Sequence, residues 1–295
     1  MVQERILLSI IIPCLNQNDQ KLKELLASIR YQDFPTNQME VLVISEGTSE
    51  SAKAIGIRRA KGEVVGILAS DNELMQHRFL THMTECAKEN GACYPQRYSH
   101  IYPDNALNRY FALIGGNDPM CYYMGKNDKA SYLNNRLNQR GSIGDNGFFI
   151  RKSLVESTDL DNYYHIDNAI EANVVPSVCD LSIWHKTGGN IFSFFAKRYR
   201  YGLQHAFNPN RRWHLVDFHQ PKDIVRLLWF IFCSATLVEP FILSLRGYLK
   251  IRDRAWFIHP VACLMTLLTY ACLVAHLSIR GLIQSLSAPM VGARA

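Results

Sequence analysis

Short apolar runs alternate with helical spacing over the first third of the chain. Three runs are rich in β-branched residues and bounded by turn residues, which is typical of buried parallel strands. Between the first two, apolar residues recur at the spacing of one helix face. The predicted strands are Ile6–Ile12, Met39–Ile44 and Val64–Leu68. The first predicted helix contains Leu22, Leu25, Leu26 and Ile29, and the second is Ala52–Ala60. This order favours a parallel sheet with right-handed crossovers.

The pattern continues more sparsely beyond this unit. A helical stretch, Met75–Lys88, follows the third strand. Two further strands, Phe148–Ile150 and Val178–Trp184, flank a short helix, Asn168–Asn173. The segment Tyr98–Arg140 carries no motif with a mechanism, so a border of a substrate pocket and a structural excursion both stay open for it. Neither GxGxxG nor GxxxxGK[ST] occurs, which removes support for dinucleotide and P-loop binding.

The third strand ends in a small residue, a carboxylate and an amide, Ser70, Asp71 and Asn72. In open α/β sheets, ligands bind at the carboxyl ends of the strands. A single carboxylate there can hold a divalent cation against a diphosphate, because hard cations take oxygen ligands and bridge phosphates. The alternative is that Asp71 caps the following helix. The local pattern leaves both interpretations open.

Composition is that of a folded chain. The 295 residues are 48% hydrophobic and 20% charged, which argues against extensive disorder and allows one large or two modest domains. The net charge of +6 comes without an aromatic-interleaved basic repeat, so we expect no nucleic-acid partner, and an anionic membrane surface explains the charge as well. The eight cysteines show no CxxC and no zinc-like pairing with histidine, and we interpret them as free thiols in a reducing compartment.

Two long uncharged runs near the C-terminus predict membrane helices. Leu227–Val238 resumes after a Glu-Pro break and extends to Leu245, and Ala255–Ala275 follows. Each approaches the ~20 residues that span a bilayer. The loop between them carries Arg246, Lys250, Arg252 and Arg254. If both runs span, this loop lies opposite the N-terminal domain, against the positive-inside tendency, and a re-entrant hairpin would remove the conflict. We favour two spans, because buried soluble helices rarely stay apolar for so long.

Aromatic and basic side chains alternate just before these runs, a mixture that suits the headgroup zone of a membrane. They are Lys197, Arg198, Arg200, Arg211 and Arg212, with Phe195, Tyr199, Tyr201 and Trp213. The start of the chain, Met1–Arg5, does not have the pattern of a signal peptide, and Ile6–Ile12 is too short to span. We therefore expect the N-terminal domain to remain in the cytosol.

Three segments together carry a resemblance to a known family. They are Leu8–Asn16, Val41–Ser49 and Ala60–Asn72. Their order and spacing resemble the family 2 glycosyltransferases of the GT-A fold, and the resemblance extends to about His185. It implies a Rossmann-like nucleotide-sugar domain. With the C-terminal runs, the expected fold class is an α/β GT-A domain followed by a helical membrane hairpin.

The resemblance also implies donor-site residues. The second turn of the family carries two acids, the second of which recognises the nucleotide base; here Ser45 and Glu46 stand there. The family's DxD metal motif falls on Ala69-Ser70-Asp71, where only the last acid remains. Magnesium or manganese can still take one protein carboxylate together with phosphates and waters. The expected nucleotide-binding residues are Pro13, Asn16, Glu46, Ser70 and Asp71.

Further matches lie in the second half of the chain. His185 matches a C-terminal histidine that reaches the metal, and imidazole is a reasonable manganese ligand, although a lone histidine is usually structural. The glycine-rich Gly141–Gly147 is similar to the acceptor-side loop, with an ordinary hairpin turn as the alternative; the expected acceptor-binding residues are Gly144, Asp145 and Asn146. Asp167 takes the place of the family's catalytic base, with Ile166 where the family has glutamate. The alternative for Asp167 is a helix N-cap.

The prediction is a membrane-anchored, metal-dependent inverting glycosyltransferase of hexosyl type, using Mn²⁺ or Mg²⁺, with its catalytic domain in the cytoplasm. It moves a sugar from a nucleotide-sugar donor to a lipid-linked acceptor of the cell-envelope glycan type. A polyprenyl phosphate acceptor needs no base, so the presence of Asp167 favours a hydroxyl. A catalytically silent membrane scaffold is the competing class, because acids are missing at Ala69, Ser70 and Ile166. The expected domains are 1–190 for transfer, 191–222 for the interface and 223–295 for the membrane.

Overall fold

The computed structural model describes residues 5–14, 16–99, 105–114, 118–125, 146–161, 163, 165–186, 190–205 and 215–287. The strands are β1 (Leu8–Pro13), β2 (Met39–Ile44), β3 (Val64–Leu68), β4 (Asn72–Leu74), β5 (Ala92–Ser99), β6 (Asn146–Arg151) and β7 (Ser177–His185). The helices are α1 (Gln20–Arg30), α2 (Ser49–Arg59), α3 (Phe79–Asn90), α4 (Ala106–Ile114), α5 (Pro119–Tyr123), α6 (Lys152–Val155), α7 (His165–Glu171), α8 (Ile191–His205), α9 (Pro221–Thr236), α10 (Val238–Lys250) and α11 (His259–Ser287), with the 3₁₀ segments η1 (Thr36–Gln38) and η4 (Arg254–Ile258).

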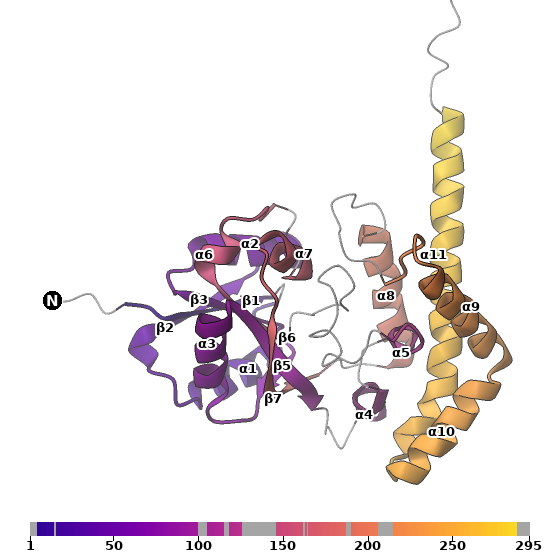
Figure 1. Cartoon of the computed structure of the whole chain (residues 1–295), viewed down its shortest axis with the longest axis horizontal. Coiled ribbons are helices and arrows are strands. Elements are labelled where there is room, and N and C mark those ends of the chain that lie inside the picture. Colours follow the sequence, from indigo (N-terminus) through magenta and orange to yellow (C-terminus); the bar gives the residue numbers. More distant parts are fainter. Residues whose placement is uncertain are drawn as a thin grey trace, which may run out of the picture.

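The described strands form one sheet in the order β2-β1-β3-β6-β5-β7-β4 (Figure 1). β1 is parallel to both β2 and β3, which confirms the predicted parallel unit. The second half of the sheet is mixed, because β6 runs antiparallel to β3 and β5, and β4 runs antiparallel to β7. β5 and β7 are parallel to each other. As a result, β1, β2, β3, β5 and β7 all end at the same edge of the sheet.

Helices cover both faces of the sheet (Figure 1). On one face, α1 and α3 pack on β1, β3 and β6 through a core that includes Leu25, Met83 and Phe149. On the other, α2, α6 and α7 pack around Ile57 and Ile67. The predicted α/β class is confirmed, because buried strands sandwiched by helices on both faces account for both cores.

The chain after β3 departs from the sequence expectation. Asp71 was a candidate cap for a helix over Met75–Lys88, but the three-residue strand β4 follows it and α3 begins at Phe79 with Arg78 as its N-cap. Asp71 therefore caps no helix. Its side chain is left at the edge of the sheet, where ligands bind in folds of this class.

The helices α4, α5 and α8–α11 form a second packed region beside the sheet (Figure 1). α4 and α8 pack with η4 and α11, and α5 packs with α9 and α11. Close helix contact depends on small residues: a Cβ on Gly202 of α8 would lie 2.4 Å from Leu273 of α11, and one on Gly247 would overlap the Trp256 ring. Within the segment Tyr98–Arg140, Tyr98 and Ser99 pair with β7, and the helices α4 and α5 pack against the C-terminal helices.

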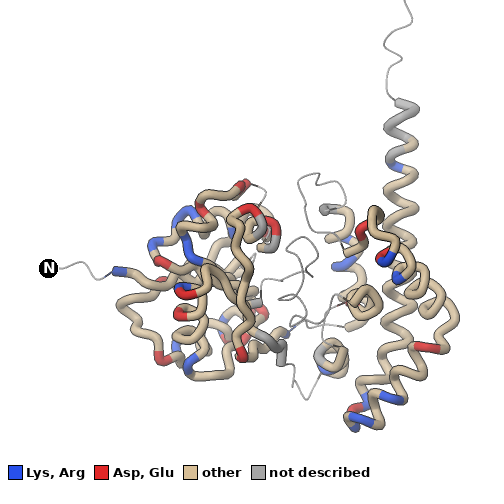
Figure 2. The backbone as a smooth tube through the Cα atoms, in the orientation of Figure 1, with Lys and Arg blue, Asp and Glu red and all other residues tan. Residues whose placement is uncertain are grey.

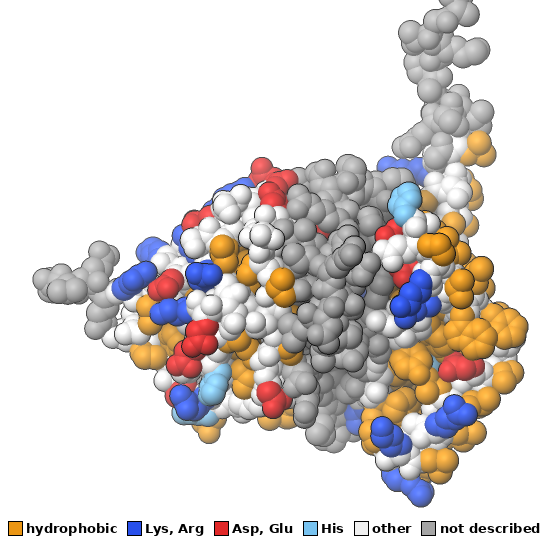
Figure 3. Space-filling view, in the orientation of Figure 1, with side chains coloured by type: hydrophobic (Ala, Val, Ile, Leu, Met, Phe, Trp, Pro, Cys, Tyr) orange, Lys and Arg blue, Asp and Glu red, His pale blue; other side chains and the backbone are white. Residues whose placement is uncertain are grey.

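One helix of the described chain is long and apolar enough to cross a membrane, by length and composition alone: Arg254–Arg280, with 27 residues. The sequence of α11, from His259 to Ser287, contains one charged residue, Arg280 (Figure 2). The other apolar run is not one straight helix, because α9 and α10 meet at a bend of 85° at Leu237, which has a left-handed backbone. Hydrophobic side chains gather on the outer surface of α9 and α10 (Figure 3).

Candidate functional site

Four predicted site residues lie at the same edge of the sheet because their strands run the same way. Asn16 follows β1, Glu46 follows β2, Asp71 follows β3, and His185 ends β7. Parallel strands place their carboxyl ends along a common edge, so side chains from distant parts of the sequence meet there. The sequence placed these residues at strand ends, and the described topology brings the ends to one edge.

Asp71 and His185 contact each other, although β3 and β7 are separated in the sheet by β6 and β5. The cause is β4. It turns away from β3 and pairs with the tip of β7, with Asn72 opposite His185. The backbone N–H of Lys186 donates to the Asp71 carbonyl at 2.7 Å, and His185 Nε2 lies 3.3 Å from Asp71 Oδ1. Both side chains are largely buried, with 10% and 18% exposed for His185 and Asp71.

A tight turn fixes the carboxylate. The fully buried Asn72 accepts a hydrogen bond on Oδ1 from the Ala69 N–H at 2.8 Å and donates its own N–H to the Ala69 carbonyl at 2.9 Å. Asn72 thus closes the loop that carries Asp71. This is the role that asparagine often has in turns, where its amide replaces a backbone partner.

The electrostatic surroundings favour the charged form of Asp71. Burial opposes ionisation, but the charge and hydrogen bond of His185, together with the charges of Lys197 and Lys21, outweigh it and hold the pKa of Asp71 below its ordinary value. Lys197 comes from α8 and Lys21 from α1. A carboxylate surrounded by cationic groups suits a site for an anionic ligand bound together with a metal.

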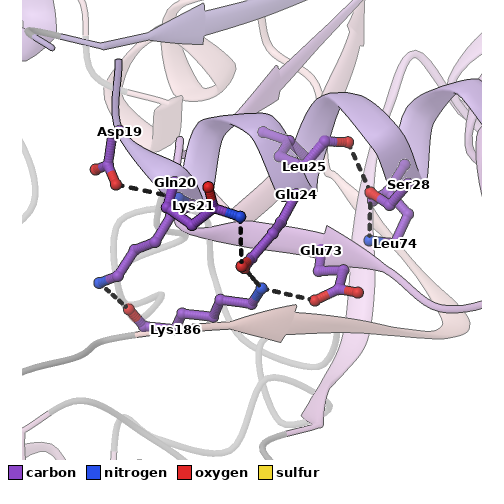
Figure 4. A network of polar contacts seen from close by, with 9 residues as sticks. All are labelled: Asp19, Gln20, Lys21, Glu24, Leu25, Ser28, Glu73, Leu74 and Lys186. Atoms are coloured by element: carbon purple, nitrogen blue, oxygen red, sulfur yellow. Dashed lines mark hydrogen bonds and ion pairs between the residues drawn. The ribbon is translucent and has the colours of Figure 1, made fainter. Parts of the chain in front are cut away.

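A buried lysine anchors the same edge (Figure 4). Lys186 has 7% of its side chain exposed, and its Nζ pairs with Glu24 of α1 and with Glu73 of β4, the latter at 2.8 Å. The Lys186 carbonyl accepts a hydrogen bond from Lys21 Nζ at 2.9 Å. Ser28 adds a link, because its hydroxyl accepts from the Leu74 N–H at 3.1 Å. The network joins α1, β4 and β7 directly beside Asp71 and His185.

The donor set fits a divalent cation. Asp71 offers a carboxylate oxygen and His185 an imidazole nitrogen, donors that manganese accepts together. Adjacent donors of an octahedral ion at 2.0–2.1 Å lie about 3 Å apart, close to the separation of these two atoms. Two protein donors leave most positions for phosphates and water, as magnesium and manganese sites of this kind require. Ala69 and Ser70 add no carboxylate.

The remaining donor-site residues lie along the same edge. Pro13 ends β1 opposite Ile44. Asn16 holds its own turn, since Oδ1 accepts from the Asn18 N–H at 3.0 Å. Glu46 is held in a two-pronged ion pair, with both Arg59 nitrogens at 3.1 Å from its oxygens.

Asp167 lies in the first turn of α7, as its third residue, and is buried with 7% exposed. The N-cap alternative does not apply, because the helix begins at His165. The His165 ring packs 5.0 Å from Phe148, which pairs with Ile67 of β3. The start of α7 therefore sits over β6 and β3, four residues before Asp71 along β3.

The predicted acceptor loop falls mostly outside the described residues: Gly144 and Asp145 are not among them, and of Asn146 only the backbone is described, pairing with Leu68. Gly147 has φ of 86°, and a Cβ there would lie 3.1 Å from the Pro95 ring. A glycine is needed at this position both for backbone freedom and for space.

Sequence reasoning missed Lys186, Lys21, Lys197 and Arg59 as neighbours of the site. Lys186 follows His185 directly, but nothing in the sequence shows that a lysine there is buried. The pairing partners Glu24 and Glu73 become visible only once β4 pairs with β7.

No known family model matches the chain, and no curated protein matches it either. Among solved structures, a mannosyltransferase from Pyrobaculum calidifontis in complex with GDP-Man and Mn²⁺ has 13% identity and a TM-score of 0.47, over 89% of this chain and 86% of its own. S. aureus TarS 1-349 has 15% identity and a TM-score of 0.40, over 90% of this chain and 91% of that fragment. TarS 1-349 in complex with UDP-GlcNAc has 13% identity and a TM-score of 0.39, over 90% and 92%. These likenesses are too distant to assign an activity to this chain.

Proposed function

We propose that this protein is an inverting glycosyltransferase that moves a sugar from a nucleotide-sugar donor to a lipid-linked acceptor. The observation that carries the proposal is the contact between Asp71 and His185 at the carboxyl edge of the sheet, built by the pairing of β4 with β7. The three segments that resemble the GT-A family 2 enzymes run through this same edge.

Asp71 and His185 would hold a divalent cation, which, when bound, offsets negative charge on the diphosphate leaving group. Lys21 and Lys197 add positive potential where the phosphates would lie, since both act on the Asp71 carboxylate. Pro13, Asn16, Glu46 and Ser70 are proposed to line the nucleotide position along the ends of β1, β2 and β3. Arg59 would share base recognition with Glu46, because it already holds that carboxylate.

Asp167 is the proposed general base, which takes a proton from the attacking hydroxyl as the new bond to the anomeric carbon forms. Its burial limits contact with water, and its helix sits over β6, the strand that begins at the predicted acceptor residue Asn146. A polyprenyl phosphate acceptor is already anionic and would not use this group. The activity of Asp167→Asn therefore separates the two acceptor classes.

The apolar helices are proposed to hold the site beside a membrane, with the catalytic domain in the cytoplasm. Contacts along α9 and α10 support a bend that lies in the interface in place of a second span. Arg226 Nη1 donates to the Met124 carbonyl at 2.8 Å, Glu239 pairs with Tyr123, and Asp253 pairs with Arg109 at 2.9 Å. The first half of α9, the start of α10 and the turn after α10 therefore each contact α4, α5 or the residue that ends α5.

This arrangement removes the conflict over the cationic loop. The chain between Ser99 at the end of β5 and Ala106 at the start of α4 reaches at most about 25 Å. The expected cationic loop is mostly helical, because Arg246 and Lys250 lie in the last turns of α10 and Arg254 begins η4. Since Arg109 of α4 pairs with Asp253, we propose that this cationic end of α10 lies on the side of the catalytic domain. Cations on the cytoplasmic side follow the positive-inside tendency. α11 is then the proposed membrane-contacting helix, through the exposed apolar side that α4, α5 and α8 leave uncovered.

The experiment is a donor screen with detergent-solubilised full-length protein, lipid extract and manganese, following release of the nucleoside diphosphate. We expect one donor to be turned over by the wild type and by Asp180→Asn, a matched control on an exposed acid of β7. Asp71→Ala should lose both turnover and manganese-dependent donor binding. Donor binding that is unchanged in Asp71→Ala would overturn the proposal, and donor binding without any turnover would favour the silent scaffold.

A further inference from the structure

Three cysteines that are far apart in the sequence meet on one face of the sheet. Cys86 lies in α3, Cys93 in β5 and Cys179 in β7, and their Sγ atoms all lie within 4.8 Å of one another. Within the part of the chain that the structure describes, no other group of three His, Cys, Asp or Glu side chains is gathered closely enough to share a metal ion.

The register of the sheet brings them together. β5 and β7 are parallel, with Cys93 opposite Ser177 and Pro95 opposite Cys179. Side chains two residues apart on a strand share a face, so Cys93 and Cys179 point to the same side. That side is covered by α3, whose last turns carry Cys86. Gly91, with φ of 87°, reverses the chain between α3 and β5.

We propose that Cys86, Cys93 and Cys179 together bind one thiophilic cation, zinc(II) or copper(I). Thiolate sulfur is the ligand that selects these ions over magnesium or manganese. Tetrahedral zinc with bonds of 2.3 Å places its sulfurs about 3.8 Å apart. The three sulfurs therefore need to approach one another by no more than about 1 Å, which side-chain rotation can supply.

Two further features fit such a site. Cys93 is fully buried, whereas Cys86 is partly exposed, which gives an ion a path from solvent and leaves room for water as a fourth ligand. Asn90 Nδ2 lies 3.6 Å from Cys86 Sγ as a donor, and such outer hydrogen bonds stabilise a metal-bound thiolate. Binding would release the thiol protons, so it should weaken as the pH falls.

The site is separate from the proposed donor site, and its consequence is structural. A bound ion would tie α3 to β5 and β7, three elements joined otherwise by side-chain packing and the sheet. Because it binds the folded chain, it would raise the melting temperature in proportion to the logarithm of its concentration. β7 ends at His185, so the tie fixes the strand that carries a proposed active-site ligand.

The test uses full-length protein in detergent, reduced and then freed of metal by chelation. Titration with cobalt(II) as a spectroscopic substitute for zinc should give a thiolate-to-cobalt charge-transfer band that saturates at one equivalent and is displaced by zinc. Copper(I) is titrated in parallel, and the ion that binds at one equivalent and raises the melting temperature is the one that the site holds. Cys86→Ser and Cys179→Ser should each weaken binding by more than the roughly 10–100-fold typical for loss of an outer partner. Cys272→Ser, on an exposed thiol of α11, and His185→Ala should keep the band.

A second measurement does not depend on variants that fold. In the wild type, one equivalent of zinc should slow alkylation of Cys86, mapped by mass spectrometry, while Cys272 reacts at an unchanged rate. The proposal is wrong if no ion gives a thiolate band and alkylation of Cys86 is unaffected by zinc and copper. It is equally wrong if protein isolated without reductant carries a disulfide between two of the three cysteines that persists in the native state.

Discussion

The buried lysine at the edge of the sheet allows a sharp test of how the candidate site is held. Lys186 is nearly inaccessible to water, whereas its partners Glu24 and Glu73 have 39% and 26% of their side chains exposed. The two sides of this network therefore differ in what each deletion leaves behind. Lys186→Met leaves two carboxylates that water can reach, while the double change Glu24→Gln and Glu73→Gln leaves a buried ammonium without a counter-charge.

The magnitudes follow from this asymmetry. Leaving a buried charge unpaired costs about 3–5 kcal/mol, because the desolvation cost remains after the attraction is lost. Removing Lys186 itself loses hydrogen bonds to charged groups, worth about 1.5–3 kcal/mol, and methionine keeps the packing of the apolar stem. We expect the double variant to be less stable than Lys186→Met by about 2 kcal/mol. For a domain of this size, that corresponds to roughly 4–8 °C in melting temperature.

The measurement is the thermal unfolding of full-length protein in detergent, followed at a signal from the sheet. Arg78→Met is the control, because Arg78 pairs with Asp33 at the surface, with 62% of its side chain exposed, and such pairs contribute about 0–1 kcal/mol. The reasoning would be refuted if Lys186→Met were as destabilising as the double variant, or more so. That result would mean that losing the lysine costs more stability than leaving its ammonium without a counter-charge, so burial of the unpaired charge would not be the dominant cost.

The same network predicts that part of the folding stability is lost in acid. The hydrogen bond from Lys186 is the largest cause that holds the pKa of Glu24 below its ordinary value. A carboxyl with a lowered folded pKa adds stability above its unfolded pKa and loses it as the pH falls through the folded value. The contribution should therefore disappear only in the acid range below the ordinary pKa of glutamate, and it should be absent in Lys186→Met.

Three further predictions address the proposed chemistry and the helices. Asp71→Ala should abolish manganese-dependent donor binding in isothermal titration, while Asp180→Asn binds as the wild type; retained manganese dependence would exclude Asp71 as a ligand. Asp167→Asn should lose about 10²–10⁴-fold in turnover with donor binding intact, as expected for a general base, and wild-type turnover would indicate a phosphate acceptor or another base. Gly202→Leu should separate α8 from α11, because its Cβ alone would lie 2.4 Å from Leu273. It should lower the melting temperature by several degrees, whereas Phe192→Ser, at an exposed position on the same helix, should have little effect.

Much of the parallel half of the sheet could be predicted from the sequence, because its signals are local. The runs that became β1, β2 and β3 are short and β-branched, and the capped helical face from Leu22 to Ile29 became α1. Asp71 and His185 could be placed at strand ends for the same reason. Their mutual contact could not, because it depends on β4, a strand of three residues that is too short to leave a periodic pattern.

Other features depend on register or on distant packing. The cysteine cluster requires the alignment of Pro95 with Cys179, and cysteine spacing alone carries no trace of it. The break at Leu237 was visible as the following Glu-Pro, yet an 85° bend, with α9 packed on α5 and α10 packed on η4, was not. Sequence hydropathy measures how apolar a run is, but it does not show whether the run continues in one direction.

The packing of the segment after β5 explains how the two regions of the molecule act together. α4 and α5 lie in sequence between β5 and β6, yet their apolar side chains pack on η4, α9 and α11. The helices that would meet a membrane are therefore connected to the two strands that separate β3 from β7 in the sheet. α8 makes a second connection between the two regions. It packs on α11, and its Lys197 is near enough to Asp71 to lower the pKa of that carboxyl. If the apolar helices insert as proposed, a lipid-borne acceptor would approach the edge of the sheet from the side of α8, and the membrane would define the direction from which the donor is attacked.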